Sequence, residues 1–174
     1  KKVKMKDVDE VLQALADIRF YRIQYAAVPK HRELDVRYYN FLALHAMRLP
    51  IRFYGDSIYQ QWVEGVGEIP NQIIVTSLGA ETYDVNGTLV EGAECKTIFK
   101  ELIRQNLDYI IRFKVDDEML YGDYITVMAS VREALNELKD EYAIEKYLKH
   151  WEQLYPDKEE EIYYRFPFRF FEEK

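Results

Sequence analysis

The chain has 174 residues, hydrophobic side chains at 48% of its positions, and a formal charge of −7 from 24 basic and 31 acidic residues. This length and composition predict a folded chain with one domain and room for an appendage, and exclude a disordered one. Nucleic acid is a poor candidate for the main partner. Phosphate contacts need clustered Lys and Arg, and no dense basic run follows the first six residues.

The aromatic load is heavy, with fifteen Tyr, nine Phe and two Trp, which suits a well-filled core or a protein-contact surface. Cys95 is the single cysteine, so the sequence predicts an inert buried thiol and neither a disulfide nor a thiolate metal site. No apolar stretch approaches the roughly 20 residues of a membrane span. The opening KKVKMKD suits a soluble region excised from a longer protein.

Residues 1–70 predict an N-terminal helix and strand segment whose role the sequence does not indicate. Glycine and proline at Gly65, Gly67 and Pro70 give the strongest punctuation, so we place a boundary there, between 1–70 and 71–174. The elements expected before it are a helix over Asp7–Asp17, a strand over Ile18–Val28, a helix over Glu33–Met47, and a turn or helix start within Ile51–Trp62.

After the boundary the pattern predicts the order β-β-α-β-α-β. This order indicates an α/β (α+β) fold, a small two-layer sandwich with helices laid on one mixed sheet. The hairpin carries the strongest short signal, Asn86-Gly87. The expected elements are a strand over Asn71–Leu78, a hairpin over Thr82–Val90, a helix over Cys95–Ile103, a buried strand over Asp108–Val115, a helix from Tyr124 towards Trp151, and a strand over Glu161–Phe170.

The final predicted strand is also the candidate partner-binding segment. Alternation would place Tyr163, Arg165, Pro167 and Arg169 on one face, and Pro167 favours an edge strand. An edge strand flanked by acidic residues could accept a strand from a partner.

Asp116, Asp117 and Glu118 form an acidic cluster that could bind a divalent cation through oxygen ligands. Adjacent residues at a strand end point to opposite faces, and no D-x-D-x-D-G spacing is present. We therefore expect a structural role, with Gly122 in a permissive turn and Asp123 as the cap of the following helix.

No motif of an enzyme rises above chance. His31, His45 and His150 are widely spaced, and neither G-x-S-x-G nor a glycine-rich phosphate loop occurs. The sequence therefore predicts a non-enzymatic protein with no cofactor and no metal.

Residues 71–170 resemble the periplasmic domain of the ExbD/TolR family of biopolymer-transport proteins, in the form found in Bacteroidetes. The resemblance is carried by a strand, an x-V-N-G hairpin, a short helix, a strand ending in Asp, and a Y-G helix. The matching residues are Val85, Asn86, Gly87, Asp116 or Asp117, Tyr121, Gly122, Val127 and Met128. The family's membrane helix with its ionisable Asp has no match in this sequence.

The resemblance implies a protein-interaction domain of an envelope energy-transducing complex, with ExbB-like and TonB-like partners and a possible homodimer. It implies the periplasm or an envelope protein attached to the inner membrane, with membrane association only through a segment outside this chain. Two alternatives remain open from the residues. One is an acidic, aromatic-rich cytoplasmic adaptor or inhibitor-type binding protein. The other is a small metal-dependent hydrolase that uses Asp116, Asp117 and Glu118.

Overall fold

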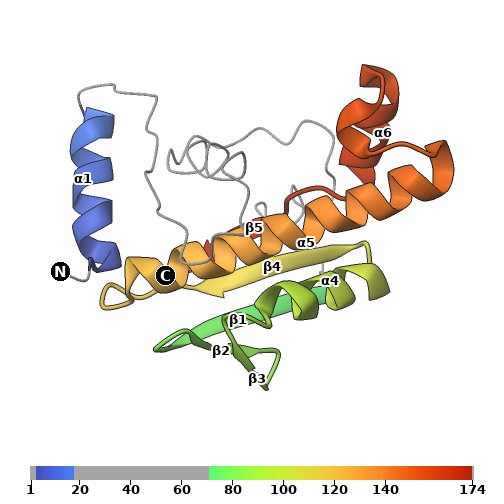
Figure 1. The fold of residues 1–174 in the computed structure, drawn as a ribbon. Helices are drawn as coiled ribbons and strands as arrows, with labels where there is room; N and C mark the ends of the chain where they lie inside the picture. The colour runs from blue at the N-terminus through green and yellow to red at the C-terminus, as the bar shows by residue number, and fades with distance from the viewer. Residues whose placement is uncertain (1–2, 18–70, 174) are drawn as a thin grey trace.

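The computed structural model describes residues 3–17 and 71–173, which form a five-stranded mixed sheet with helices packed on it (Figure 1). The strands are β1 (Asn71–Gly79), β2 (Thr82–Val85), β3 (Thr88–Glu91), β4 (Tyr109–Lys114) and β5 (Phe170–Glu173). The helices are α1 (Met5–Asp17), α4 (Cys95–Gln105), α5 (Tyr121–Tyr147), the short 3₁₀ helix η1 (Trp151–Gln153) and α6 (Pro156–Arg165).

The described strands lie in the order β3-β2-β1-β4-β5, with β1, β4 and β5 parallel and β2 antiparallel to both of its neighbours, β1 and β3. Parallel neighbours need crossover connections, and helices α4 and α5 supply them. Both helices lie against the same face of the sheet and pack on each other (Figure 1). The expected α+β class, helices on one mixed sheet, is confirmed.

The core lies between this face of the sheet and the two helices. Alternate residues of the strands point into it, as the period of two in a strand requires. On α4 and α5 the buried residues recur at three and four positions, which is the spacing of one helix face. Fully buried members include Val75, Tyr83, Ile111, Phe113, Phe99, Ile103, Val127 and Val131.

The predicted hairpin turn is confirmed. Asn86 and Gly87 have φ of 53° and 84°, the left-handed values that a two-residue hairpin loop requires. The Asn86 side chain also joins the turn to the sheet, because its Oδ1 accepts a hydrogen bond of 2.7 Å from the backbone N–H of Ile74. Asp84 Oδ1 accepts a second bond of 2.7 Å from the Gly87 N–H.

A second left-handed turn, between β1 and β2, carries no glycine or asparagine at its two loop positions. Ala80 and Glu81 have φ of 53° and 60°, and Gly79 before them has φ of 86°. The turn is held by a hydrogen bond of 2.8 Å from the Gly92 N–H to the Glu81 carbonyl. A left-handed conformation costs a residue with a Cβ about 1–2 kcal/mol, so this turn is strained.

The prediction of a strand over Glu161–Phe170 is wrong. Its first half, Glu161–Arg165, belongs to helix α6, and the strand β5 begins only at Phe170. Pro156 is at the first helical turn, with Asp157 and Glu159 in the same turn, so the N-terminal helix signals outweigh the aromatic content. Ile162 and Phe166 are both buried while Tyr164 between them is 55% exposed, which fits a helix and which an alternating pattern does not explain.

The predicted start of α5 is also wrong in detail. The helix begins at Tyr121 with Leu120 as its N-cap residue and no capping side chain. Asp123 is inside the first turn and is 4% exposed, with its Oδ2 3.4 Å from Ser77 Oγ, so it does not cap the helix. Gly122 is helical, its φ is not in the left-handed region, and a Cβ there would meet open space. The expected permissive turn is therefore absent.

Helix α1 is confirmed over nearly the predicted range, and its start is tied to the loop before α5. Met5 is 4% exposed, and its N–H donates a hydrogen bond of 2.9 Å to the Met119 carbonyl. The Tyr121 N–H donates a bond of the same length to the Val3 carbonyl. The other predictions for the first seventy residues lie outside the described residues, with His31, His45 and the proposed boundary among them. The division into 1–70 and 71–174 stays a prediction.

The strained turn gives a stability test. Ala80→Gly should raise the free energy of unfolding by about 1 kcal/mol, because glycine adopts φ near 53° without a Cβ clash. The matched control is Gly87→Ala, which should lower it by a similar amount. No atom lies within 4 Å of a Cβ at Gly87, so that change isolates the backbone effect. Urea denaturation measures both, and unchanged midpoints would show that neither turn is strained.

Candidate interaction surface

The four residues predicted to line one strand face do not share a surface. Tyr163 and Arg165 are exposed on α6, whereas Pro167 and Arg169 are buried in the connection to β5. The prediction of a common partner-binding face fails because the chain through Arg165 is helical. Arg165 instead lies over the ring of Tyr142, 4.5 Å from its centroid.

Pro167 and Arg169 attach the tail to the sheet. Arg169 is 7% exposed, and its Nη1 donates a hydrogen bond of 2.7 Å to the Leu107 carbonyl. The hydroxyl of Tyr109 donates to the Pro167 carbonyl. These bonds hold the segment before β5 against β4, so we assign both residues a structural role.

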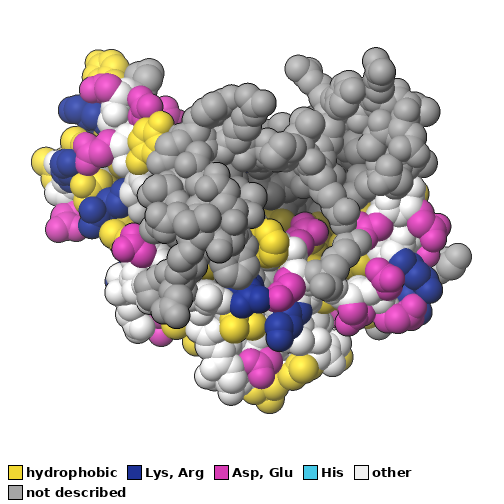
Figure 2. All heavy atoms as spheres, turned by 180° about the vertical axis from the view of Figure 1, so that it is seen from behind, with side chains coloured by type: hydrophobic (Ala, Val, Ile, Leu, Met, Phe, Trp, Pro, Cys, Tyr) yellow, Lys and Arg dark blue, Asp and Glu magenta, His cyan; other side chains and the backbone are white. Residues whose placement is uncertain are grey.

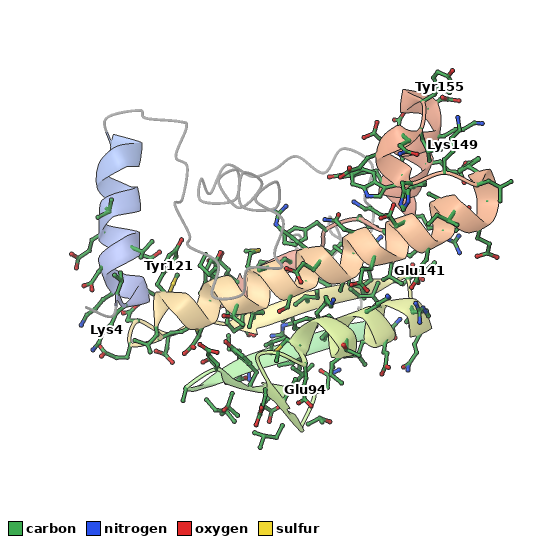
Figure 3. All side chains as sticks on the ribbon, viewed as in Figure 1. Lys4, Glu94, Tyr121, Glu141, Lys149 and Tyr155 are labelled. Atoms are coloured by element: carbon green, nitrogen blue, oxygen red, sulfur yellow. The ribbon has the colours of Figure 1, made fainter. Side chains whose placement is uncertain are left out.

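Exposed apolar side chains occur instead on the C-terminal lobe, which we define as residues 148–166. This lobe follows α5 and stands at one end of it, with Tyr155 at its tip (Figures 1 and 3). The exposed fractions are 87% for Leu148, 72% for Tyr155, 55% for Tyr164 and 45% for Tyr163. From behind, hydrophobic side chains on the lobe are interleaved with acidic and basic ones (Figure 2). Such a mixture of rings and charges is typical of contact surfaces.

The lobe is held on α5 by packing and by one carboxylate. Ile162 and Phe166 are buried against it. The carboxylate of Glu161 pairs with the Lys146 ammonium and accepts hydrogen bonds from Tyr147 (2.6 Å) and Tyr142 (3.0 Å). The ammonium, followed by the two hydroxyls, lowers the pKa of Glu161 to about 2. The lobe is therefore attached to α5 at a defined place.

Beneath the lobe lies a lysine that sequence reasoning missed. Lys139 of α5 is 7% exposed, and its Nζ is 5.1 Å from the ring centroid of Trp151 in η1 and 5.0 Å from that of Tyr163. Burial, and then the charge of Arg132, lower its pKa to about 8. The only signal in the sequence was a spacing of seven between Arg132 and Lys139, which puts two cations on one side of a helix.

The acidic cluster lies at the surface, and one of its members pairs with the start of the chain. Asp116, Asp117 and Glu118 are exposed in the loop between β4 and α5. Glu118 forms ion pairs with Lys4 and with Lys6, the latter at 2.9 Å, and this lowers its pKa to about 2. Glu118 thus anchors the start of α1 to the loop before α5, and Figure 3 shows Lys4 close to Tyr121 at the start of α5.

His150 and Cys95 are two further candidate reactive groups within the described residues. His150 Nδ1 is 3.3 Å from Asp140 on an exposed surface. Cys95 is fully buried, as expected, and burial raises its pKa to about 11, which leaves the thiol protonated. Within residues 3–17 and 71–173, no three His, Cys, Asp or Glu side chains are grouped to hold a metal ion. None of the described helices is long and apolar enough to cross a membrane.

Comparison of the chain with models of protein families, with curated proteins and with solved structures finds no match.

The Glu118 anchor predicts a local change in dynamics. Glu118→Gln should speed hydrogen exchange at the Met5 and Tyr121 amides, whose bonds join the chain start to the loop before α5. Low pH should act in the same direction, because a lowered pKa means that the stabilisation is lost as pH falls from 4.5 towards 2. Asp117→Asn, a neighbouring exposed carboxylate, is the control. Equal exchange rates in the two variants would contradict the anchoring role of Glu118.

Lys139 predicts a pH-dependent stability difference. Its folded pKa lies below the ordinary value of 10.5, so the cost of the buried charge is full below pH 8 and is relieved as pH rises to 10.5. Lys139→Met should therefore raise the free energy of unfolding by about 1–3 kcal/mol at pH 7, and the gain should shrink above pH 8. Denaturation at several pH values checks it. A gain that does not change with pH would contradict it.

Proposed function

We propose that residues 71–173 form a non-enzymatic protein-interaction domain of an envelope energy-transducing complex, resembling the periplasmic domain of the ExbD/TolR family. The observation that carries the proposal is the C-terminal lobe. Four large apolar side chains lie exposed on this one short segment: Leu148, Tyr155, Tyr163 and Tyr164. Exposed rings beside charged residues favour binding of another protein over binding of a small molecule.

The order of elements supports the family resemblance. A strand, a hairpin turned by Asn86-Gly87, a short helix, a buried strand and a long helix follow one another, as the family pattern requires. Tyr121 starts the long helix, and Val127 and Met128 are buried in its core-facing side. The residues that carry the resemblance therefore have roles in turns and packing, which a shared fold would need.

The partners that fit are proteins of the ExbB and TonB type, or a second copy of this chain, and the compartment would be the periplasm or the periplasmic side of the inner membrane. The charge of the lobe also indicates what a partner surface should look like. The exposed acidic residues of α6 border the tyrosines: Asp157, Glu159 and Glu160. A partner surface with an apolar centre and a basic rim would complement it.

The same lobe would suit an acidic adaptor in the cytoplasm, so the identity of the partner decides between the two functions. The hydrolase reading is less favoured, because Glu118 is already engaged by Lys4 and Lys6 and the cluster is open to solvent.

Site-specific photocrosslinking tests the proposal. A photoreactive residue at Tyr155 or Tyr164 of the full chain, expressed in its native cells, should crosslink to an envelope protein of ExbB or TonB type, or to a second copy. A photoreactive residue at Leu89, which is 70% exposed on β3 away from the lobe, is the control. Mass spectrometry of the adducts identifies the partner.

Replacing two exposed tyrosines of the lobe gives the matching binding test. Tyr155→Ser with Tyr164→Ser should weaken binding of the crosslinked partner at least about tenfold, as loss of one or two aromatic anchors does. Because both side chains are exposed, the unfolding midpoint should hardly change. Crosslinks to cytoplasmic proteins alone would favour the adaptor, and equal crosslinking from Leu89 would remove the lobe as the contact surface.

A further inference from the structure

The environment of Lys139 is unusual for an ammonium group. The side chain is 7% exposed, and its Nζ lies against the rings of Trp151 and Tyr163, at 5.1 and 5.0 Å from their centroids. In the part of the chain that the structure describes, the ammonium makes no ion pair and donates no hydrogen bond. A buried charge normally has such a partner, so packing alone does not account for this lysine.

The charges around Lys139 come from its own helix and from α6. Arg132, two turns earlier on α5, is cationic and disfavours a second charge, whereas Glu159 on α6 favours it. Burial is the largest effect, and together these lower the pKa of Lys139 to about 8. At pH 7 the fraction of uncharged amine is therefore on the order of a hundredfold larger than for an ordinary lysine.

We propose that Lys139 is a nucleophilic amine that condenses with small aldehydes to form an imine against the rings of Trp151 and Tyr163. Apolar burial beside a second cation is the arrangement that activates lysine for this chemistry. Small size is required because Lys139 is only 7% exposed.

The reaction needs no oxidant and no further reactant. The uncharged Nζ attacks the carbonyl carbon and forms a C–N bond, giving a carbinolamine. Loss of its hydroxyl as water, with the nitrogen proton, leaves the C=N bond. The imine can take up a proton and become a cation, which the ring faces of Trp151 and Tyr163 stabilise. A modification that turned the amine into a neutral or anionic group would not gain this stabilisation. The rings therefore favour an aldehyde, whose adduct can carry a positive charge.

Lys146 is a matched comparison on the same helix. It also lies over two rings, with Nζ 5.4 Å from the centroid of Tyr142 and 5.2 Å from that of Tyr147. It is exposed and paired with Glu161, and this carboxylate raises its pKa above the ordinary value. The two lysines share aromatic neighbours and differ in burial and ion pairing, so comparing them isolates the activating features.

The experiment traps the imine in the intact full chain. The protein is incubated at pH 7 with acetaldehyde and cyanoborohydride, which reduces the imine to a stable ethylamine, and ethylation of each lysine is followed by peptide mass spectrometry. Lys139 should be ethylated roughly tenfold or more faster than Lys146. The reagent's own pH dependence cancels in the ratio of the two rates, and this ratio should fall as pH rises above about 8, where Lys139 is already largely uncharged and Lys146 is not.

Substitution of the neighbouring cation separates activation from accessibility. Arg132→Gln should slow ethylation of Lys139 at pH 7 and leave Lys146 unchanged, and Arg132→Lys should restore it. The unchanged rate at Lys146 and circular dichroism verify that the variants are folded. The pH profile of the unmodified protein tests the proposal independently of them. Lys139 ethylated no faster than Lys146 at pH 7, or not at all, would overturn it.

Discussion

The parallel pairing of β4 with β5 is the constraint on which the rest of the structure depends. A parallel neighbour can be reached only by a crossover, so the chain after β4 must run back over the sheet before β5 begins. Helix α5 makes this return. Its 27 residues span about 40 Å, whereas the six residues of β4 span about 20 Å. The helix therefore extends well past the strand, as Figure 1 shows.

The overshoot explains the C-terminal lobe. The chain must travel back from the end of α5 to the start of β5, and η1 and α6 cover that distance. The turn-back begins at Leu148, a residue with φ of 57° that is 87% exposed. The lobe lies beyond the sheet, so its outer tyrosines have no core to enter. The exposed surface is a geometric consequence of a helix longer than the strand it covers.

The position of α5 is fixed on its other side by α4. Lys100 bridges Glu137 and Glu141 of α5, and Lys96 and Arg104 extend the contact in both directions along the helix. Surface pairs of this kind contribute little to stability individually, but their spacing of four residues matches between the helices and favours one register. This row of pairs and the core beneath it hold the sheet half of α5. Beyond Glu141, the described contacts of α5 are with the lobe, where Glu161 pairs with Lys146 and accepts hydrogen bonds from Tyr142 and Tyr147.

The sequence predicted the elements whose signals are local. Asn86-Gly87, the apolar run of β4 and the periodicity of α5 each depend on neighbouring residues, and each is found in the structure. The tail was mispredicted because its alternating aromatic residues resemble a strand, while Pro156 and the acidic first turn favour a helix. Asp123 was taken as a cap because its type suits one, but the helix already begins at Tyr121, and the Asp123 side chain is buried near Ser77.

The candidate site could not be predicted for a related reason. Whether a tyrosine on α6 is exposed depends on how far α5 extends beyond the sheet, and this follows from the length of α5 relative to β4. Lys139 shows the same dependence: on its own helix it is an ordinary lysine, and it becomes a buried cation only when η1 and α6 fold back over it. Replacing such a lysine with an apolar residue commonly stabilises a protein. Keeping this cation under two rings thus lowers the stability of the chain where the lobe meets α5. In natural proteins such destabilising residues are found most often where the side chain has a function besides folding.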